Sequence, residues 1–294
     1  MKIERMKEWI RMIYFNNVSK YFKNVLAVNQ ASFDIKEGEC TALVGVNGAG
    51  KSTIIDMLIG NLHADKGNIT SDFNLKQQTG ILYQRTEFPD LIRVRELFEL
   101  YTQLYTNHLN MKEFKELTRF DDEQLNQFAT HLSGGQQRIL DFALTVMGKP
   151  RFIILDEPTS AMDATMRKYF WKVIEAYKKE GKTIFYTTHY LEEVEKMADR
   201  VIVLSKGSIV NDNIPSIIRQ QVRKSTIHVP IKYQHLLVKE IQSEFQIKQQ
   251  EILIISEEVE DVLMQLIKLN INLNEIEITK ASLADYIFEE ENLS

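Results

Sequence analysis

The stretch GVNGAGKST, residues 45–53, restricts the fold of this 294-residue chain more than any other feature. It fits the pattern G-x-x-x-x-G-K-S/T, follows the strand-like run Thr41 to Val44, and opens a predicted helix from about Ser52 to Ile59. The glycines let successive backbone N–H groups turn toward one point at the positive end of a helix. The stretch therefore predicts an α/β fold in which a strand, a tight loop and a helix form a phosphate site.

Two side chains of this loop have separate predicted tasks. Lys51 is expected to reach the β and γ phosphates of a nucleotide, and the Ser52 hydroxyl to bind Mg²⁺. The remaining candidates for nucleotide binding in the loop are Gly45, Asn47, Gly48, Ala49, Gly50 and Thr53.

A second stretch, FIILDEP, places two carboxylates at the end of a predicted strand. Phe152 to Leu155 are all apolar, as expected for a buried strand, and Asp156 and Glu157 follow directly. Open α/β sheets bind ligands at the carboxyl ends of their strands. We therefore expect Asp156 to join the Mg²⁺ shell and Glu157 to polarise the attacking water.

The order of elements predicts a mainly parallel sheet. Strand-like runs at RFIILDEP and GKTIFYTTH alternate with predicted helices at Thr165 to Tyr177 and Leu191 to Ala198, a pattern typical of a sheet covered on both faces. VIVLSKGSIV predicts a hairpin about KG. From Leu91 to Asn126 the apolar spacing becomes helical, with stripes that include Leu97, Leu100, Leu104, Phe114 and Leu117, which predicts a helical insertion.

Composition excludes several classes of function. The formal net charge of −5 supplies no concentrated basic face for nucleic acid. Cys40 is the only cysteine, so the chain has no disulfide framework, and its apolar setting predicts a buried side chain. No run approaches the roughly 18 uncharged apolar residues of a spanning helix. We therefore expect that the chain does not cross a membrane by itself.

A third stretch, THLSGGQQRIL, looks like another anion site. Ser133, Gly134 and Gly135 open a predicted helix with a hydroxyl and unobstructed N–H groups. Together with GVNGAGKST, ILYQ, FIILDEPTSAMD and TTH, this stretch resembles the ATPase subunits of ABC transporters over roughly residues 16–210. The resemblance implies a nucleotide-binding α/β fold of the ABC ATPase type, with an antiparallel β subdomain and a helical subdomain at about residues 88–140.

The resemblance also implies how the two anion sites are used. Two cassettes stand head to tail in that family, so Ser133, Gly134, Gly135 and Gln136 would cap the ATP held by the partner subunit. By the same resemblance, Phe22 would stack on adenine, with Tyr21 as the neighbouring alternative. Further implied roles are contact with Mg²⁺ and water for Gln84, communication across the dimer for Asp163, and contact with the γ-phosphate for His189.

The predicted function is an ATP-hydrolysing subunit, with ATP and Mg²⁺ as cofactors, that drives a separate membrane permease. The chain most resembles the exporters of drugs, antibiotics or peptides; an importer ATPase and a soluble, non-transport ATP switch are the alternatives. The expected assembly is a homodimer, or a pair with a related subunit, without nucleic acid, at the cytoplasmic face of the plasma membrane.

The two ends of the chain form separate predicted segments. Residues 1–11 are expected to be a dispensable extension or a short amphipathic helix, without the apolar core of a signal peptide. The ATPase domain is expected over residues 12–220, and a small α+β domain over 225–294. That last block carries 13 Asp and Glu against 5 Lys. Its acidity is interpreted as either a solvated surface or a regulatory dimer contact.

Overall fold

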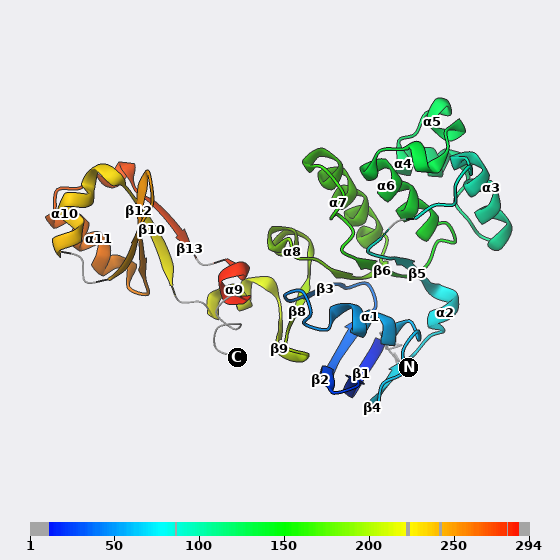
Figure 1. Ribbon diagram of the computed structural model, residues 1–294, viewed down its shortest axis with the longest axis horizontal. Coiled ribbons are helices and arrows are strands. Elements are labelled where there is room, and N and C mark those ends of the chain that lie inside the picture. Colours follow the sequence, from blue (N-terminus) through cyan, green and yellow to red (C-terminus); the bar gives the residue numbers. More distant parts are fainter. Residues whose placement is uncertain (1–11, 86, 222–223, 241–242, 281, 288–294) are drawn as a thin grey trace, which may run out of the picture. The chain divides into compact units, whose positions relative to one another are not determined.

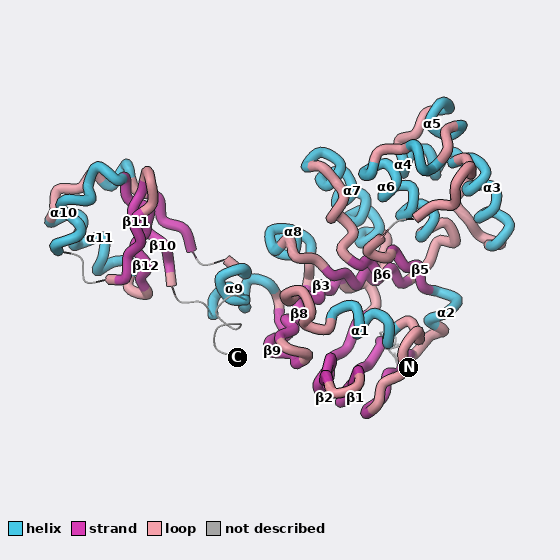
Figure 2. The backbone as a smooth tube through the Cα atoms, viewed as in Figure 1, coloured by secondary structure: helices cyan, strands magenta, loops and turns pink. Residues whose placement is uncertain are grey.

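The computed structural model describes residues 12–85, 87–221, 224–240, 243–280 and 282–287. The chain divides into two compact units, the first ending at Ile214 and the second beginning at Pro215 (Figures 1 and 2). The helix Pro215–Gln221 (α9) thus belongs to the second unit, although the sequence placed the end of the ATPase domain at residue 220. The predicted N-terminal extension, residues 1–11, lies outside the described residues.

The N-terminal unit is organised around a six-stranded sheet with strand order β5-β6-β7-β3-β8-β9. The first five strands run parallel, and β9 runs antiparallel to β8 through the predicted hairpin about Lys206 and Gly207. Every residue of β3, β6 and β7 is buried, as apolar runs in a parallel sheet require. The strands are β3 (Cys40–Val44), β5 (Thr79–Leu82), β6 (Phe152–Asp156), β7 (Thr183–Thr187), β8 (Arg200–Ser205) and β9 (Ser208–Asn213).

A smaller antiparallel sheet confirms the expected β subdomain. Its order is β2-β1-β4, with β1 spanning Met12–Phe22, β2 spanning Val25–Lys36 and β4 spanning Lys66–Ser71. Helix α1 (Lys51–Leu58) lies between the two sheets in Figure 1. The rings of Phe15 and Phe33 stack in the core between these layers, with centroids 4.2 Å apart.

Helices cover the opposite side of the six-stranded sheet (Figure 1). Helices α3 and α4 pack against α6, which carries the Ser133 stretch at its start. The helical segments of this unit beyond α1 are α2 (Leu75–Gln78), α3 (Val94–Leu104), α4 (Met111–Thr118), α5 (Asp122–Asn126), the 3₁₀ turn Ala129–His131, α6 (Gly134–Thr145), α7 (Ala164–Lys179) and α8 (Leu191–Met197). The helical insertion is therefore confirmed, and its last helix continues to Thr145.

One predicted apolar stripe is wrong in part. On α3 only Val94, Leu97 and Phe98 are buried, whereas Leu100 is 52% and Leu104 63% exposed. The buried side chains follow i, i+3, i+4 spacing and form one face. Leu100 lies to the side of that face, and Leu104 is the last residue of the helix.

The C-terminal unit is the predicted small α+β domain. After α9, its described elements follow the order βαββαβ as far as Lys280, and its four antiparallel strands are arranged β11-β12-β10-β13. Ile227, Ile252 and Leu266 contribute to a separate core beneath the helices. The elements that follow α9 are β10 (Ser225–Pro230), the 3₁₀ turn Ile231–Tyr233, α10 (Gln234–Glu240), β11 (Glu244–Ile247), β12 (Glu251–Ser256), α11 (Val259–Lys268), the 3₁₀ turn Leu273–Glu275 and β13 (Glu277–Lys280).

Candidate functional site

The phosphate loop connects β3 to α1 through positions that only glycine fits. Gly50 stands at the N-cap of α1 with φ 110°, and a Cβ there would lie 2.5 Å from the Ala27 carbonyl oxygen. A Cβ on Gly45 would lie 2.2 Å from the Leu204 carbonyl oxygen. Because Gly50 offers no side chain to cap α1, the first N–H groups of the helix stay available to an anion.

Lys51 lies across the mouth of this loop. Its ammonium donates hydrogen bonds to the carbonyl oxygens of Gly45, at 2.7 Å, and Val46, at 3.0 Å, and the residue is only 6% exposed. Burial lowers the pKa of Lys51, and the nearby Glu157 and Asp156 charges oppose that shift. The partners of the ammonium are therefore neutral carbonyl oxygens. Phosphate oxygens can take their place, because hydrogen bonds between two charged groups are stronger.

Asp156 ends the buried strand β6 and is 8% exposed. Its Oδ1 accepts a 2.5 Å hydrogen bond from the Thr187 hydroxyl at the end of β7. Burial raises the pKa of Asp156, and the Thr187 hydrogen bond opposes this shift. The carboxylate is thus a desolvated anion whose charge a bound cation would stabilise.

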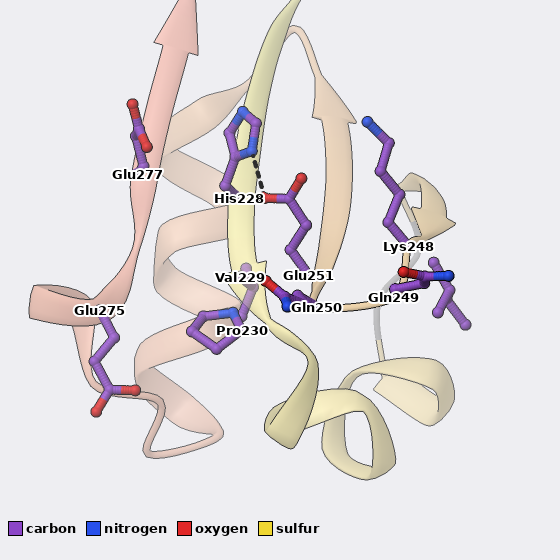
Figure 3. A pocket seen from close by; sticks show the side chains of 10 residues that line it. His228, Val229, Pro230, Lys248, Gln249, Gln250, Glu251, Glu275 and Glu277 are labelled. Atoms are coloured by element: carbon purple, nitrogen blue, oxygen red, sulfur yellow. Dashed lines mark hydrogen bonds and ion pairs between the residues drawn. The ribbon is translucent and has the colours of Figure 1, made fainter.

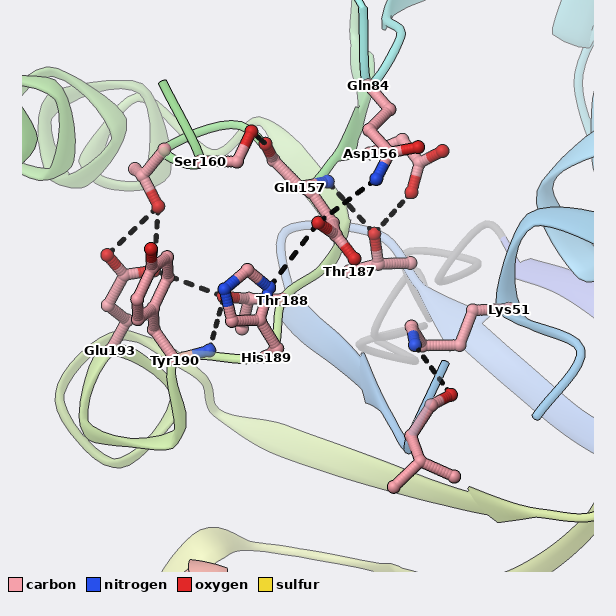
Figure 4. Close-up of polar contacts among 12 residues, drawn as sticks. Lys51, Gln84, Asp156, Glu157, Ser160, Thr187, Thr188, His189, Tyr190 and Glu193 are labelled. Carbon is pink, nitrogen blue, oxygen red and sulfur yellow. Dashed lines mark hydrogen bonds and ion pairs between the residues drawn. The ribbon is translucent and has the colours of Figure 1, made fainter. Parts of the chain in front are cut away.

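Glu157 contacts two other predicted site residues, Gln84 and His189 (Figure 4). Its Oε2 accepts a hydrogen bond from Gln84 Nε2 at 3.1 Å and lies 3.3 Å from His189 Nδ1. The Glu157 backbone has φ 43°, an unfavourable left-handed conformation for a residue with a side chain. Its N–H donates to Thr187 Oγ1 at 3.0 Å, so Thr187 helps to hold both carboxylates in place.

The donor set fits a magnesium ion that is shared with phosphate. Ser52 offers a hydroxyl, Asp156 a carboxylate and Gln84 an amide, which are hard oxygen donors. Among the described residues no group of three or more His, Cys, Asp or Glu side chains is arranged to hold a metal. Mg²⁺ suits such a sparse site because it usually keeps waters and binds substrate phosphates beside one or two carboxylates.

The Ser133 stretch forms a second, exposed helix start. Ser133 caps α6 by accepting from the Gln136 N–H at 3.3 Å, and Gln136 Oε1 accepts from the Ser133 N–H at 3.0 Å. A Cβ on Gly135 would meet the Met166 side chain at 3.3 Å, so the stretch lies beside the start of α7. Asp163 caps α7 by accepting from the Met166 N–H at 2.8 Å. The structure thus brings the Ser133 stretch next to Asp163 in the same chain.

Phe22 stands at the tip of the β1–β2 hairpin. Its side chain is 44% exposed, and the ammonium of Lys20 lies 5.8 Å from its ring centroid. The neighbouring Tyr21 is held toward β4, because its N–H donates to Asp65 at 2.6 Å and Lys66 lies over its ring. Of the two aromatic residues, Phe22 is therefore the less constrained candidate for stacking on a base.

Arg138 is a residue of the site that the sequence reasoning missed. It is 1% exposed, and its guanidinium donates to the main-chain carbonyls of Tyr83, Asp156, Glu157 and Pro158. Burial lowers its pKa to about 10, which still leaves it charged at neutral pH. A signal was present, since Arg138 stands directly before apolar residues of α6 that are buried.

A groove of about 1060 Å³ lies on the C-terminal unit and contains none of the predicted site residues. Figure 3 shows His228 and Glu251 on its sheet face. His228 Nδ1 lies 2.9 Å from Glu251 Oε2, and Nε2 lies 3.0 Å from Thr279 Oγ1. Both ring nitrogens are thus engaged across neighbouring strands. Cys40 is buried, as predicted, and burial raises the pKa of its thiol to about 12.

Comparisons with known proteins agree with this geometry. The ABC transporter family model matches residues 28–160. Nod factor export ATP-binding protein I of Burkholderia orbicola is 32% identical over 219 residues, covering 69% of this chain and 71% of that protein. The protein of the same name from Mesorhizobium japonicum is 35% identical, covering 68% of this chain and 63% of that protein.

Solved structures share the fold. An ATP-binding subunit of an ABC transporter matches with a TM-score of 0.64 and 23% identity over 71% of this chain and 92% of that one. A dimeric bacterial ABC transporter cassette matches with a TM-score of 0.61 and 22% identity over 69% of this chain and 98% of that one. By its sequence relatives and its fold, the chain belongs to the ATP-binding subunits of ABC transporters, which are magnesium-dependent ATPases.

Proposed function

We propose that two copies of this chain, or one copy and a related subunit, close around two ATP molecules and thereby drive a separate membrane permease in export. The observation that carries the proposal is the division of the site: Lys51 and Glu157 border one anion cradle, while Ser133 starts a different, exposed helix. A second subunit turned head to tail would place its own Ser133 over the cradle. Such a two-fold arrangement uses each surface twice.

The contacts around Glu157 support a division of roles within each cradle. Lys51 binds the β and γ phosphates, while Ser52, Asp156 and Gln84 hold Mg²⁺, which neutralises phosphate charge when bound. Glu157 accepts a proton from the attacking water, and His189 contacts the γ-phosphate and helps to orient Glu157. Asp163, beside the Ser133 stretch, faces the partner subunit.

Export is supported by the names of the relatives from Burkholderia and Mesorhizobium, which are named for Nod factor export. No helix of the described residues is long and apolar enough to cross a membrane. The support for a separate partner comes from the surface of the helical subdomain. On the helical subdomain Leu91, Leu100 and Leu104 are 76%, 52% and 63% exposed. Leu100 and Leu104 are one helical turn apart on α3, and exposed apolar side chains grouped in this way are typical of a partner surface. We place the assembly at the cytoplasmic face of the plasma membrane.

Replacing Lys51 by Ala is expected to weaken ATP binding by about 10-fold or more, because the phosphates lose a charge-assisted partner. Titration with a fluorescent ATP analogue measures the effect. Lys179→Ala is the control, since Lys179 is 73% exposed and paired with Glu175 on α7. Equal affinity of the Lys51→Ala variant and the unaltered protein would remove Lys51 from the cradle.

Recovery of the chain from membranes tests the proposed partner. Detergent extracts are expected to yield the chain together with a multi-span membrane protein. The substitutions Leu100→Glu and Leu104→Glu together should reduce that recovery by about 10-fold, because charges disrupt an apolar contact. Met264→Glu is the control: Met264 is 54% exposed on α11 of the other unit. Recovery with ribosomes or DNA instead of a membrane protein would contradict the transport function.

A further inference from the structure

Glu193 is a buried carboxylate that none of the roles above uses. It lies in the first turn of α8 and is only 7% exposed. Both of its carboxylate oxygens accept from the Thr159 hydroxyl, at 3.0 and 3.1 Å, and Oε2 also accepts from the Thr188 hydroxyl at 3.3 Å. In the view of Figure 4, Glu193 lies on the far side of His189 from Lys51.

The partners of Glu193 belong to the two loops that carry predicted site residues. Thr188 directly precedes His189, and its hydroxyl also accepts the N–H of Tyr190 at 2.9 Å. Thr159 lies between Glu157 and Asp163, on the loop that leads from β6 to α7. One carboxylate therefore joins the turn of His189 to the loop of Asp163.

A cation completes the cluster from a third element. Arg167, in the first turns of α7, places Nε 3.6 Å from Glu193 Oε1 and donates from Nη2 to the carbonyl of Met162 at 3.4 Å. Its guanidinium also lies 4.1 Å from the ring centroid of Tyr190. A buried carboxylate is costly unless it is paired and hydrogen-bonded, and here both conditions are met.

We propose that Glu193 is a positioning residue that makes the His189 turn and the Asp163 loop move as one body. The Glu193 carboxylate acts through the Thr188 and Thr159 hydroxyls. Contact of His189 with the γ-phosphate is thereby transmitted to the surface that meets the second subunit. This inference rests on the roles proposed above for His189 and Asp163.

The substitution Glu193→Ala tests this link by separating ATP binding from dimer closure. The variant is expected to keep the KM for ATP within about 3-fold while kcat falls by about 10-fold or more. Combined with Glu157→Gln, it should require about 10-fold more protein to form the ATP-bound dimer, as followed by light scattering. ATP affinity of the monomer should not change, because Lys51 and the loop remain.

Asp212→Ala is the matched control. The Asp212 carboxylate also pairs with a partly buried arginine, Arg200, at 2.5 and 2.6 Å, but on the β8–β9 hairpin. It should lower the thermal unfolding midpoint while leaving kcat and dimer closure unchanged. If Glu193→Ala behaves in the same way, the role of Glu193 is merely structural and the proposal is overturned.

A double-mutant cycle checks the route of the effect. Thr188→Val alone should lower kcat, and adding it to Glu193→Ala should lower kcat by less than the product of the two single effects. Fully multiplicative losses would mean that Glu193 does not act through Thr188. Glu193→Leu fills the site without offering an acceptor and serves if the alanine variant does not fold. If Glu157→Gln alone forms no ATP-bound dimer, the proposed function fails; if it does and Glu193→Ala has no effect, only this inference fails.

Discussion

Glu157→Gln is expected to lower ATP turnover by about 100-fold or more while ATP binding persists, because an amide cannot accept the proton of the attacking water. The amide oxygen can still accept from Gln84, so the geometry of the site should be retained. One negative charge near the γ-phosphate is also removed. The variant should therefore accumulate as an ATP-bound dimer that separates slowly.

Two measurements are needed for this prediction. Phosphate release gives the loss of turnover, and light scattering with and without ATP gives the dimer. Glu192→Gln is a suitable control, since Glu192 is an exposed neighbour of Glu193 on α8 and has no proposed role in the site. Normal phosphate release from the Glu157→Gln variant would exclude Glu157 as the general base.

The parts of the site that follow from local rules could be predicted from the sequence. A strand, a glycine loop and a helix are adjacent in the chain, so GVNGAGKST specifies its own shape. The buried strand β6 was evident from four apolar residues, which places Asp156 and Glu157 at the sheet edge. The capping of α6 by Ser133 likewise depends on residues three apart.

Contacts between distant segments could not be predicted in this way. Arg138 binds carbonyls 18 to 55 residues away, and Glu193 meets Thr159 across 34 residues. Each contact depends on how helices pack on the sheet, which one sequence does not reveal. The same holds for Leu104. Its spacing fits a buried stripe, but it lies beyond Phe98, the last buried residue of α3. The pairing order of the C-terminal sheet is a further case.

A mixture of two inactive variants is expected to regain ATP turnover. In the Ser133→Arg variant an arginine obstructs the helix start that would cap the ATP of the neighbour, while its own phosphate loop stays intact. In the Lys51→Ala variant the loop is damaged and the helix start is intact. Each homodimer then has two impaired sites, and turnover should fall by about 100-fold in either protein alone.

The heterodimer should differ because, in the proposed dimer, each site combines the loop of one chain with the Ser133 stretch of the other. One of its two sites carries both substitutions, and the second carries neither. Random mixing in equal amounts makes half of the dimers mixed, so turnover should recover to about one quarter of the unaltered level if the sites act independently. If each chain instead built its site alone, the mixture would stay as inactive as its components. Recovery of ATP turnover on mixing therefore distinguishes a site formed by two chains from a site formed by one chain. The test does not require knowledge of the transported substrate.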